Sequence, residues 1–103
     1  MKLFDLAKQL IQIESISGNE QQIANFLFDY LKQFGFVVEF QNVCNGRKNI
    51  YARIGNPQVV LSTHMDTVAP FTDFAEDEQF LYGRGSCDAK GILASQIRAA
   101  EEL

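Results

Sequence analysis

The stretch Val59-Val60-Leu61-Ser62-Thr63-His64-Met65-Asp66 decides the expected fold, because it changes from apolar to polar within a few residues. Its first three residues predict a short strand that is covered on both faces, as in the interior of a parallel sheet. The polar residues would then lie at the carboxyl end of that strand. Ligands of open α/β sheets gather at such ends, so the pattern predicts an α/β fold with a functional site after Leu61.

Three helices are predicted around this strand. Apolar residues at helical spacing predict the first over 3–13. The sequence Ser17-Gly18-Asn19-Glu20 fits a capping box with Ser17 as the N-cap, and it predicts a second helix that stops at Gly35. A third helix is expected from about Ala89 to the end of the chain.

Four strands complete the expected order. An Asn45-Gly46 turn predicts a hairpin between strands at 36–43 and 49–54. The strand at 59–61 comes next, and a short strand is expected at 80–82. The coarse order is therefore ααββββα.

Composition limits the class of protein. The chain has 103 residues, of which 47% are hydrophobic and 21% charged, which allows one packed domain. A net charge of −4 without clustered Lys and Arg argues against nucleic-acid binding. No apolar run reaches the roughly 18 residues of a membrane span, and no signal peptide is visible. Cys44 and Cys87 do not make a disulfide framework, so we expect a reduced, cytoplasmic protein.

Three side chains stand out chemically: His64, Asp66 and Asp88. Two residues apart in an extended segment, His64 and Asp66 would point to the same side. A carboxylate there can accept one ring N–H and leave the other nitrogen free for a metal. Asp88, after Gly83 and Gly85, could bridge paired cations. Each residue could also have an ordinary structural role. His64 could be a hydrogen-bonded structural histidine, Asp66 a turn residue, and Asp88 the N-cap of the last helix.

Two motifs resemble those of the M20 family of metallopeptidases. The stretch 59–68 with Pro70 resembles the first metal motif of that family, and Leu81-Tyr82-Gly83-Arg84-Gly85-Ser86-Cys87-Asp88-Ala89-Lys90-Gly91 resembles the second. The family includes acetylornithine deacetylase, succinyl-diaminopimelate desuccinylase, aminoacylase and several peptidases. The resemblance implies that His64 and Asp88 are metal ligands, with Asp88 bridging two metals, and that Asp66 is a catalytic residue that orients His64. It also implies a cis peptide at Asp88-Ala89.

The resemblance covers only part of a family member. It implies that residues 1–103 are the N-terminal portion of a catalytic domain, an incomplete half of a zinc-exopeptidase-like three-layer α/β domain. The lid domain and the C-terminal portion, with the general-base Glu and the remaining ligands, have no counterpart here. Glu101-Glu102 is expected to be the solvated end of the last helix, not the family's catalytic Glu pair.

The function implied by the resemblance is metal-dependent hydrolysis of an amide bond. The complete enzyme would hold two zinc or cobalt ions and act on an N-acyl amino acid or small peptide, with an acetylornithine deacetylase of amino-acid biosynthesis as the nearest branch. The complete enzyme could be a homodimer. We expect the isolated chain to be inactive and to expose uncovered apolar faces that favour association.

Two alternatives remain. The chain could be a non-catalytic fragment that binds one metal weakly or none. It could also be a nucleotide-binding module, since Gly83-Arg84-Gly85 precedes a helix as in a dinucleotide fingerprint. That fingerprint needs Gly or Ala where Asp88 stands, and the acidic side chain would repel a pyrophosphate.

Overall fold

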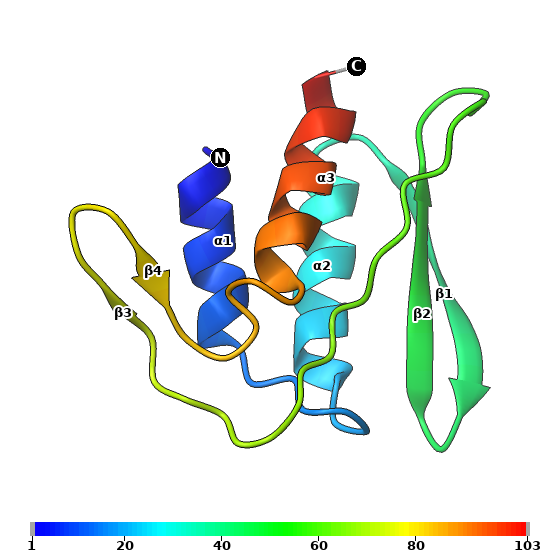
Figure 1. Cartoon of the computed structure of the whole chain (residues 1–103). Coiled ribbons are helices and arrows are strands. Elements are labelled where there is room, and N and C mark those ends of the chain that lie inside the picture. Colours follow the sequence, from blue (N-terminus) through cyan, green and yellow to red (C-terminus); the bar gives the residue numbers. More distant parts are fainter. Residues whose placement is uncertain (1, 103) are drawn as a thin grey trace.

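The computed structural model of the chain describes residues 2–102 and gives an α/β arrangement in the expected order (Figure 1). The elements are α1 (Leu3–Gln12), α2 (Gln21–Gln33), β1 (Val37–Cys44), β2 (Arg47–Arg53), β3 (Ala75–Glu76), β4 (Leu81–Tyr82) and α3 (Lys90–Glu102). The α/β class and the order ααββββα are thus confirmed. None of the helices in this part of the chain is long and apolar enough to cross a membrane.

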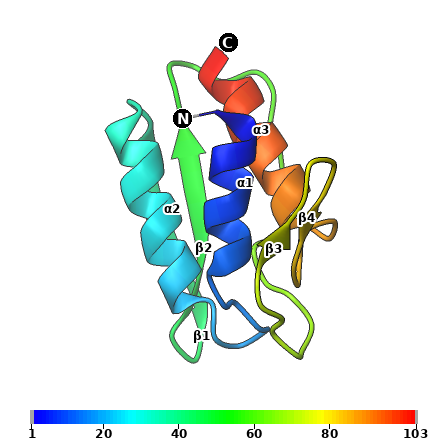
Figure 2. The same ribbon diagram turned by 90° about the vertical axis from the view of Figure 1, so that its left-hand side faces the viewer.

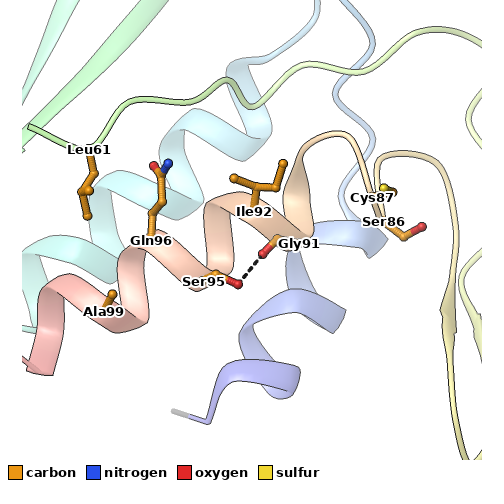
Figure 3. Close-up of a pocket in the computed structure, with 8 residues that line it drawn as sticks. All are labelled: Leu61, Ser86, Cys87, Gly91, Ile92, Ser95, Gln96 and Ala99. Atoms are coloured by element: carbon orange, nitrogen blue, oxygen red, sulfur yellow. Dashed lines mark hydrogen bonds between the residues drawn. The ribbon is translucent and has the colours of Figure 1, made fainter.

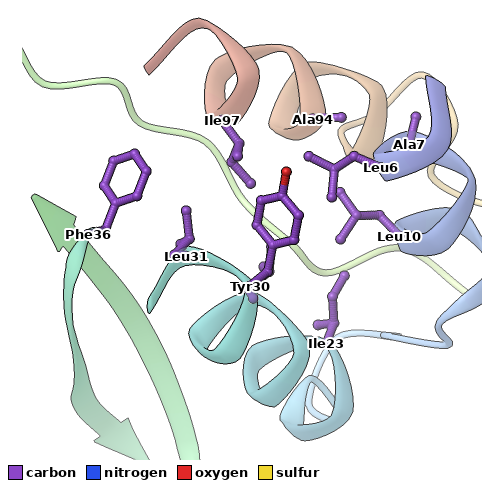
Figure 4. Packing of buried hydrophobic residues seen from close by; sticks show 10 residues of the cluster. Leu6, Ala7, Leu10, Ile23, Tyr30, Leu31, Phe36, Ala94 and Ile97 are labelled. Carbon is purple, nitrogen blue, oxygen red and sulfur yellow. The ribbon is translucent and has the colours of Figure 1, made fainter. Parts of the chain in front are cut away.

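The three helices form the core by turning their apolar faces toward one another. Helix α1 packs against α3, and α2 lies between this pair and the β1–β2 hairpin (Figures 1 and 2). The buried side chains of the three helices converge on one cluster (Figure 4). Its labelled members are Leu6, Ala7, Leu10, Ile23, Tyr30, Leu31, Phe36, Ala94 and Ile97. The apolar spacing that predicts the helices is therefore the spacing that builds the core.

The β1–β2 hairpin is turned by Asn45-Gly46, as predicted. Both residues have positive φ, 49° and 76°, which is the conformation that favours Asn and Gly in two-residue hairpin turns. The strands pair antiparallel from Val37 opposite Arg53 toward this turn. On the helix side, the Phe40 ring stacks on Phe28 of α2 with ring centroids 4.6 Å apart.

The strand predicted at 59–61 is wrong. Residues 59–61 belong to no strand, and Val60 is 81% exposed. An interior strand needs a neighbour on each edge and a covering layer on each face. Within the described residues, the segment 59–61 pairs with no strand, and the strand that follows β2 is β3, which forms a two-residue pairing with β4.

The capping box predicted at Ser17 is also wrong. Helix α2 begins at Gln21 with Glu20 as its N-cap residue, and no side chain caps it. The Glu20 carboxylate does accept the Gly18 backbone N–H at 3.2 Å. Its stronger partner is Arg47, whose Nε and Nη2 lie 3.0 and 2.5 Å from the two carboxylate oxygens. Ser17 is thus left outside the helix, with its hydroxyl available to another segment.

The end of α3 is only partly solvated. The Glu102 side chain is 73% exposed, but that of Glu101 is 7% exposed, and both carboxylates pair with Arg98. Among the described residues, Glu101 Oε1 and the buried Tyr30 hydroxyl have no hydrogen-bond partner. Burial raises the pKa of Tyr30 to about 12, and the neighbouring Glu101 carboxylate adds to the shift. The expectation for Glu101 was therefore wrong, because α3 turns this residue toward the core.

Candidate functional site

His64 and Asp88 come from segments 24 positions apart and meet directly. The Nε2 atom of His64 lies 2.9 Å from Oδ1 of Asp88. The histidine stands in the extended segment that follows Leu61, and the aspartate stands in the turn before α3. The Asp88 side chain is 85% exposed, so its carboxylate is open to solvent. The structure thus brings together the two side chains for which the sequence predicts metal binding.

Asp66 holds the opposite side of the imidazole. Its Oδ1 lies 2.8 Å from Nδ1 of His64, and its backbone oxygen lies 3.1 Å from the same nitrogen. A carboxylate in this position favours the tautomer that carries its proton on Nδ1, which leaves Nε2 as a lone-pair donor. This is the arrangement that the spacing of residues 64 and 66 predicts.

A third partner of the site, Ser17, is not identified by sequence reasoning. The Ser17 hydroxyl donates to Oδ2 of Asp66 at 2.5 Å, across 49 positions of sequence. Its one local signal is the alternation Ser15-Ile16-Ser17, which in an extended segment turns both hydroxyls to one side. The capping-box pattern obscures this signal, because Ser17 fits the capping box as well as the alternation.

The segment 15–17 lies beside the segment 65–67 as a short parallel pair. Ile16 and Thr67 form the bridge. Two backbone hydrogen bonds secure it, from Thr67 N to Ser15 O at 2.9 Å and from Ser17 N to Thr67 O at 3.0 Å. The buried Ser15 hydroxyl adds a bond to the Met65 carbonyl at 2.8 Å. The loop that carries His64 and Asp66 is therefore tied to the connection between α1 and α2.

Asp88 is placed by a tight turn whose glycine fits against its neighbours. Gly85 has φ of 87°, and a Cβ atom there would come within 2.7 Å of Thr67 Cγ2 and 3.2 Å of Lys90 Cδ. Lys90 N donates back to Gly85 O at 2.8 Å, which closes the turn onto α3. The Asp88-Ala89 peptide is cis, as the family resemblance implies.

Lys90 connects this turn to the end of α1. Its side chain is 1% exposed, and its Nζ donates to the Ile13 carbonyl at 2.5 Å, at the end of α1. Burial lowers the pKa of Lys90 to about 8. A long buried side chain with one hydrogen-bond partner among the described residues acts here as a spacer between α1 and the turn that presents Asp88.

The electrostatics of the site favour a charged or metal-bound imidazole. The hydrogen bond to the Asp88 carboxylate is the main cause that raises the pKa of His64. Burial opposes it, and Asp66 adds to the upward shift. The Ser17 hydroxyl lowers the pKa of Asp66, and His64 contributes in the same direction. The Asp66 carboxylate therefore stays ionised at neutral pH and places negative charge beside Nδ1 of the ring.

The donor set fits part of a zinc site. Imidazole nitrogen and carboxylate oxygen are both common zinc ligands, at about 2 Å each, so two ligands of one ion lie about 3 Å apart. The 2.9 Å between His64 Nε2 and Asp88 Oδ1 agrees with this spacing. A catalytic zinc takes three protein ligands. Within residues 2–102, no group of three or more His, Cys, Asp or Glu side chains could hold a metal ion.

One surface hollow contains the site, and a second lies beside it. The first is lined by His64, Asp66, Arg84 and Asp88, and Arg84 is held by a hydrogen bond from its Nε to the Pro70 carbonyl at 2.8 Å. The other is a shallow apolar groove along α3 beside Leu61 (Figure 3). The first hollow contains the candidate ligands His64 and Asp88. The second begins at Ser86 and Cys87 and runs away from them toward Ala99.

Comparison with known proteins identifies relatives over the whole chain. The family described as peptidase family M20/M25/M40 matches residues 60–103. A peptidase M20 domain-containing protein of Schizosaccharomyces pombe is 45% identical over 98% of this chain and 27% of its own length. A probable carboxypeptidase of Arthroderma gypseum is 38% identical, with the same coverage of both chains. A probable carboxypeptidase of Aspergillus clavatus is 33% identical over 98% of this chain and 28% of its own length.

The chain therefore spans about a quarter of the length of these curated relatives. The match begins within the segment that leads to His64 and continues through the turn with Asp88, so it includes both candidate ligands. Together with the geometry of residues 64, 66 and 88, it agrees with the resemblance in the sequence motifs. The chain belongs to peptidase family M20.

Proposed function

We propose that this chain supplies one His and one Asp ligand to the metal centre of an amide-bond hydrolase. His64 and Asp88 are the ligands, with Asp88 as a bridge between two metals, and Asp66 orients the His64 ring. The observation that carries the proposal is the pairing of opposite ring nitrogens with different carboxylates, 2.8 Å to Asp66 and 2.9 Å to Asp88. Zinc or cobalt bound there would polarise the amide carbonyl and activate water.

The chain's own groups contribute binding and orientation. Asp66 holds the proton of the ring at Nδ1, and this keeps Nε2 pointed at Asp88. The exposed Asp88 carboxylate faces the hollow where substrate would approach. The proposed substrates are small peptides or N-acyl amino acids, such as N-acetylornithine. The names of the fungal relatives favour carboxypeptidase chemistry over deacetylation, so both substrate types belong in the test.

Metal binding by the 103-residue chain is the first test. We expect calorimetry with cobalt or zinc to show weak binding of one ion, lost in His64→Ala and in Asp88→Asn. His64 is the only histidine of the chain, so the first substitution removes all imidazole ligation. Tight binding of two ions by the unmodified chain, or binding unaffected by His64→Ala, would contradict the proposed ligands.

Hydrolysis is the second test. A chimera in which residues 1–103 replace the matching segment of the Schizosaccharomyces pombe relative provides the rest of a family-length protein. With zinc, it should hydrolyse an N-blocked dipeptide or N-acetylornithine at the rate of the unmodified relative within about tenfold, and Asp88→Asn should abolish this. The 103-residue chain itself should show no turnover.

A non-catalytic role of the isolated chain is the second candidate. The observation that favours it is the incomplete ligand set in residues 2–102. It predicts no cobalt binding by the chain alone and no turnover, together with an active chimera. An inactive chimera beside an active relative would remove the enzymatic proposal for these residues altogether.

A further inference from the structure

We infer that Ser17 is a positioning residue of this site, whose hydroxyl fixes the Asp66 carboxylate and, through it, the His64 ring. The metal-binding consequence rests on the function proposed above, whereas the geometric consequence does not. The relay runs from Ser17 Oγ to Asp66 Oδ2 at 2.5 Å and from Asp66 Oδ1 to His64 Nδ1 at 2.8 Å. Each oxygen of the carboxylate thus has its own partner.

Separate partners for the two oxygens matter because the carboxylate of an aspartate rotates easily about its terminal torsion. The χ2 angle of Asp has a broad, roughly two-fold distribution, so a single hydrogen bond leaves the carboxylate free to rock. A second bond on the other oxygen defines the plane of the carboxylate. Asp66 stands in a part-exposed position, where packing alone does not fix it. Ser17 is the only described residue that supplies this second bond.

Ser17 can do this because its own backbone is held. Its N–H donates to Thr67 O at 3.0 Å, and Thr67 N donates to Ser15 O at 2.9 Å, so residue 17 is in fixed register with residue 66. On its other side, the Gly18 N–H donates to Glu20 at 3.2 Å. Glu20 is buried and is held in turn by Arg47 at the tip of the hairpin. The position of the hydroxyl is therefore determined from both directions.

Two simpler roles for Ser17 do not fit these contacts. It is not the N-cap of α2, since the helix begins at Gln21 without a side-chain cap. Its hydroxyl is also 3.3 Å from Thr67 O, but a hydroxyl has one proton, and the 2.5 Å contact to a charged acceptor is the stronger bond. A purely structural clamp between the two segments is already provided by the backbone bonds.

The test uses the fact that the chain has a single histidine. Long-range proton–nitrogen NMR spectra of the metal-free chain report directly which ring nitrogen of His64 carries the proton when the ring is neutral. Asp66 at Nδ1 and Asp88 at Nε2 compete for this proton, so we expect a definite share of the Nδ1–H tautomer in the unmodified chain. In Ser17→Ala, the share of this tautomer should fall and the two nitrogen resonances should move toward each other. Ser17→Thr keeps a hydroxyl and should restore the original spectrum.

Ser95→Ala is the matched control, because Ser95 also loses one hydroxyl bond, to Gly91 O at 2.9 Å, without contact to Asp66. It should leave the His64 resonances unchanged. A folded Ser17→Ala chain with the original tautomer would overturn the inference, and so would a Ser17→Thr chain that behaves like Ser17→Ala. If Ser17→Ala does not fold, three-bond couplings in the unmodified chain decide. One χ1 rotamer at both Ser17 and Asp66 supports the relay, and averaging at either residue refutes it.

Cobalt affinity separates this inference from the proposed function. Removing a partner of a metal ligand costs about 10- to 100-fold in affinity, so a partner one bond further away should cost about three- to tenfold. We expect this loss in Ser17→Ala and recovery in Ser17→Thr. If the unmodified chain binds no cobalt but the tautomer changes occur, metal ligation by this chain fails while Ser17 keeps its role. If the chain binds cobalt but Ser17→Ala changes neither the affinity nor the tautomer, metal ligation stands and the role of Ser17 is refuted.

Discussion

The Asp66 side chain links Ser17 to His64 and is part-exposed, so its substitution should weaken metal binding without unfolding the chain. Asp66→Asn keeps the shape but removes the charge that supports the Nδ1–H tautomer. We expect cobalt affinity to fall about 10- to 100-fold, the range for substitutions of carboxylates that orient a ligating His. Asp73→Asn, an equal charge change at an exposed residue, should have no effect in the same titration. Equal losses in both variants would mean that net charge, not orientation, controls binding.

Single residues also show what the sequence can and cannot reveal. His64, Asp66 and Asp88 are recognisable because their chemistry is rare in a chain with one histidine and because their motifs are long. Ser17 is missed because its partner lies 49 positions away, while the competing capping-box pattern is local and complete. Glu20 is assigned to that capping box for the same reason, although its main partner, Arg47, is 27 positions away. Sequence patterns such as the capping box involve neighbouring residues, whereas the partners of Ser17 and Glu20 are distant in the sequence.

The Glu20–Arg47 pair gives the stability of the chain a defined pH dependence. The Arg47 guanidinium lowers the pKa of Glu20, and the Gly18 N–H adds to this shift. A carboxyl group with a lowered pKa in the folded state stabilises that state above its unfolded pKa. This contribution is lost as pH falls through the lower folded value. The pair should therefore stabilise the chain at pH 7, by about 1 kcal/mol for a partly exposed bidentate contact.

Urea unfolding at several pH values checks this. Glu20→Gln should be less stable than the unmodified chain at pH 7, and the difference should shrink as pH is lowered below about 4.3, where an unfolded Glu takes up its proton. Glu78→Gln, at an exposed residue, should show no such difference. A Glu20→Gln deficit that stays constant into acid would show that packing of residue 20, not its charge, is responsible.

Among the elements, the turn before α3 is the most sensitive to a small change. Gly85→Ala would place a methyl group 2.7 Å from Thr67 and 3.2 Å from Lys90 and would force Ala into a φ of 87°. The turn would have to move, and Asp88 with it. We expect a loss of about 2–4 kcal/mol of stability, from backbone strain and overpacking together, and loss of cobalt binding.

Gly55→Ala separates the two causes. Gly55 also has a positive φ, 59°, but a Cβ atom there meets nothing within 4 Å. This variant should lose only the strain component, about 1 kcal/mol, and should keep its metal affinity. Thermal unfolding and cobalt titration of both variants give the comparison. Equal effects at residues 55 and 85 would rule out close approach as the reason for glycine in the turn.

At the level of elements, the predictions succeed where an element buries its own apolar face within the described chain. The spacing of Leu6 and Leu10, or of Ile23 and Leu27, finds its partner helices inside residues 2–102, so the helices are correct. The Asn45-Gly46 turn needs only its two adjoining strands. The run 59–61 predicts an interior strand, and such a strand requires neighbours that these residues do not provide.

For the molecule as a whole, this leaves an extended apolar segment on the surface of a small, acidic chain. Val59, Val60 and Leu61 are all exposed, and Ile92 on α3 is exposed beside the groove that Leu61 lines. Contiguous apolar surface and unpaired strand-like backbone both favour association with another polypeptide. With a net charge of −4, repulsion between copies is weak at physiological salt. We therefore expect the 103-residue chain to self-associate through this segment.

Val60→Lys should test this most directly, because Val60 is the most exposed of the three and contributes least to the fold of the monomer. Burial of one Val side chain at a contact contributes about 1.5–3 kcal/mol, and a buried Lys adds a desolvation cost, so association should weaken at least about tenfold. Val43→Lys, also exposed but on the hairpin, makes the same chemical change away from the segment. Sedimentation velocity over a concentration series should show dimers or larger species for the unmodified chain and for Val43→Lys, and monomers for Val60→Lys. A monomeric unmodified chain at its highest soluble concentration would contradict the expectation, because the exposed valines would then be tolerated without a partner.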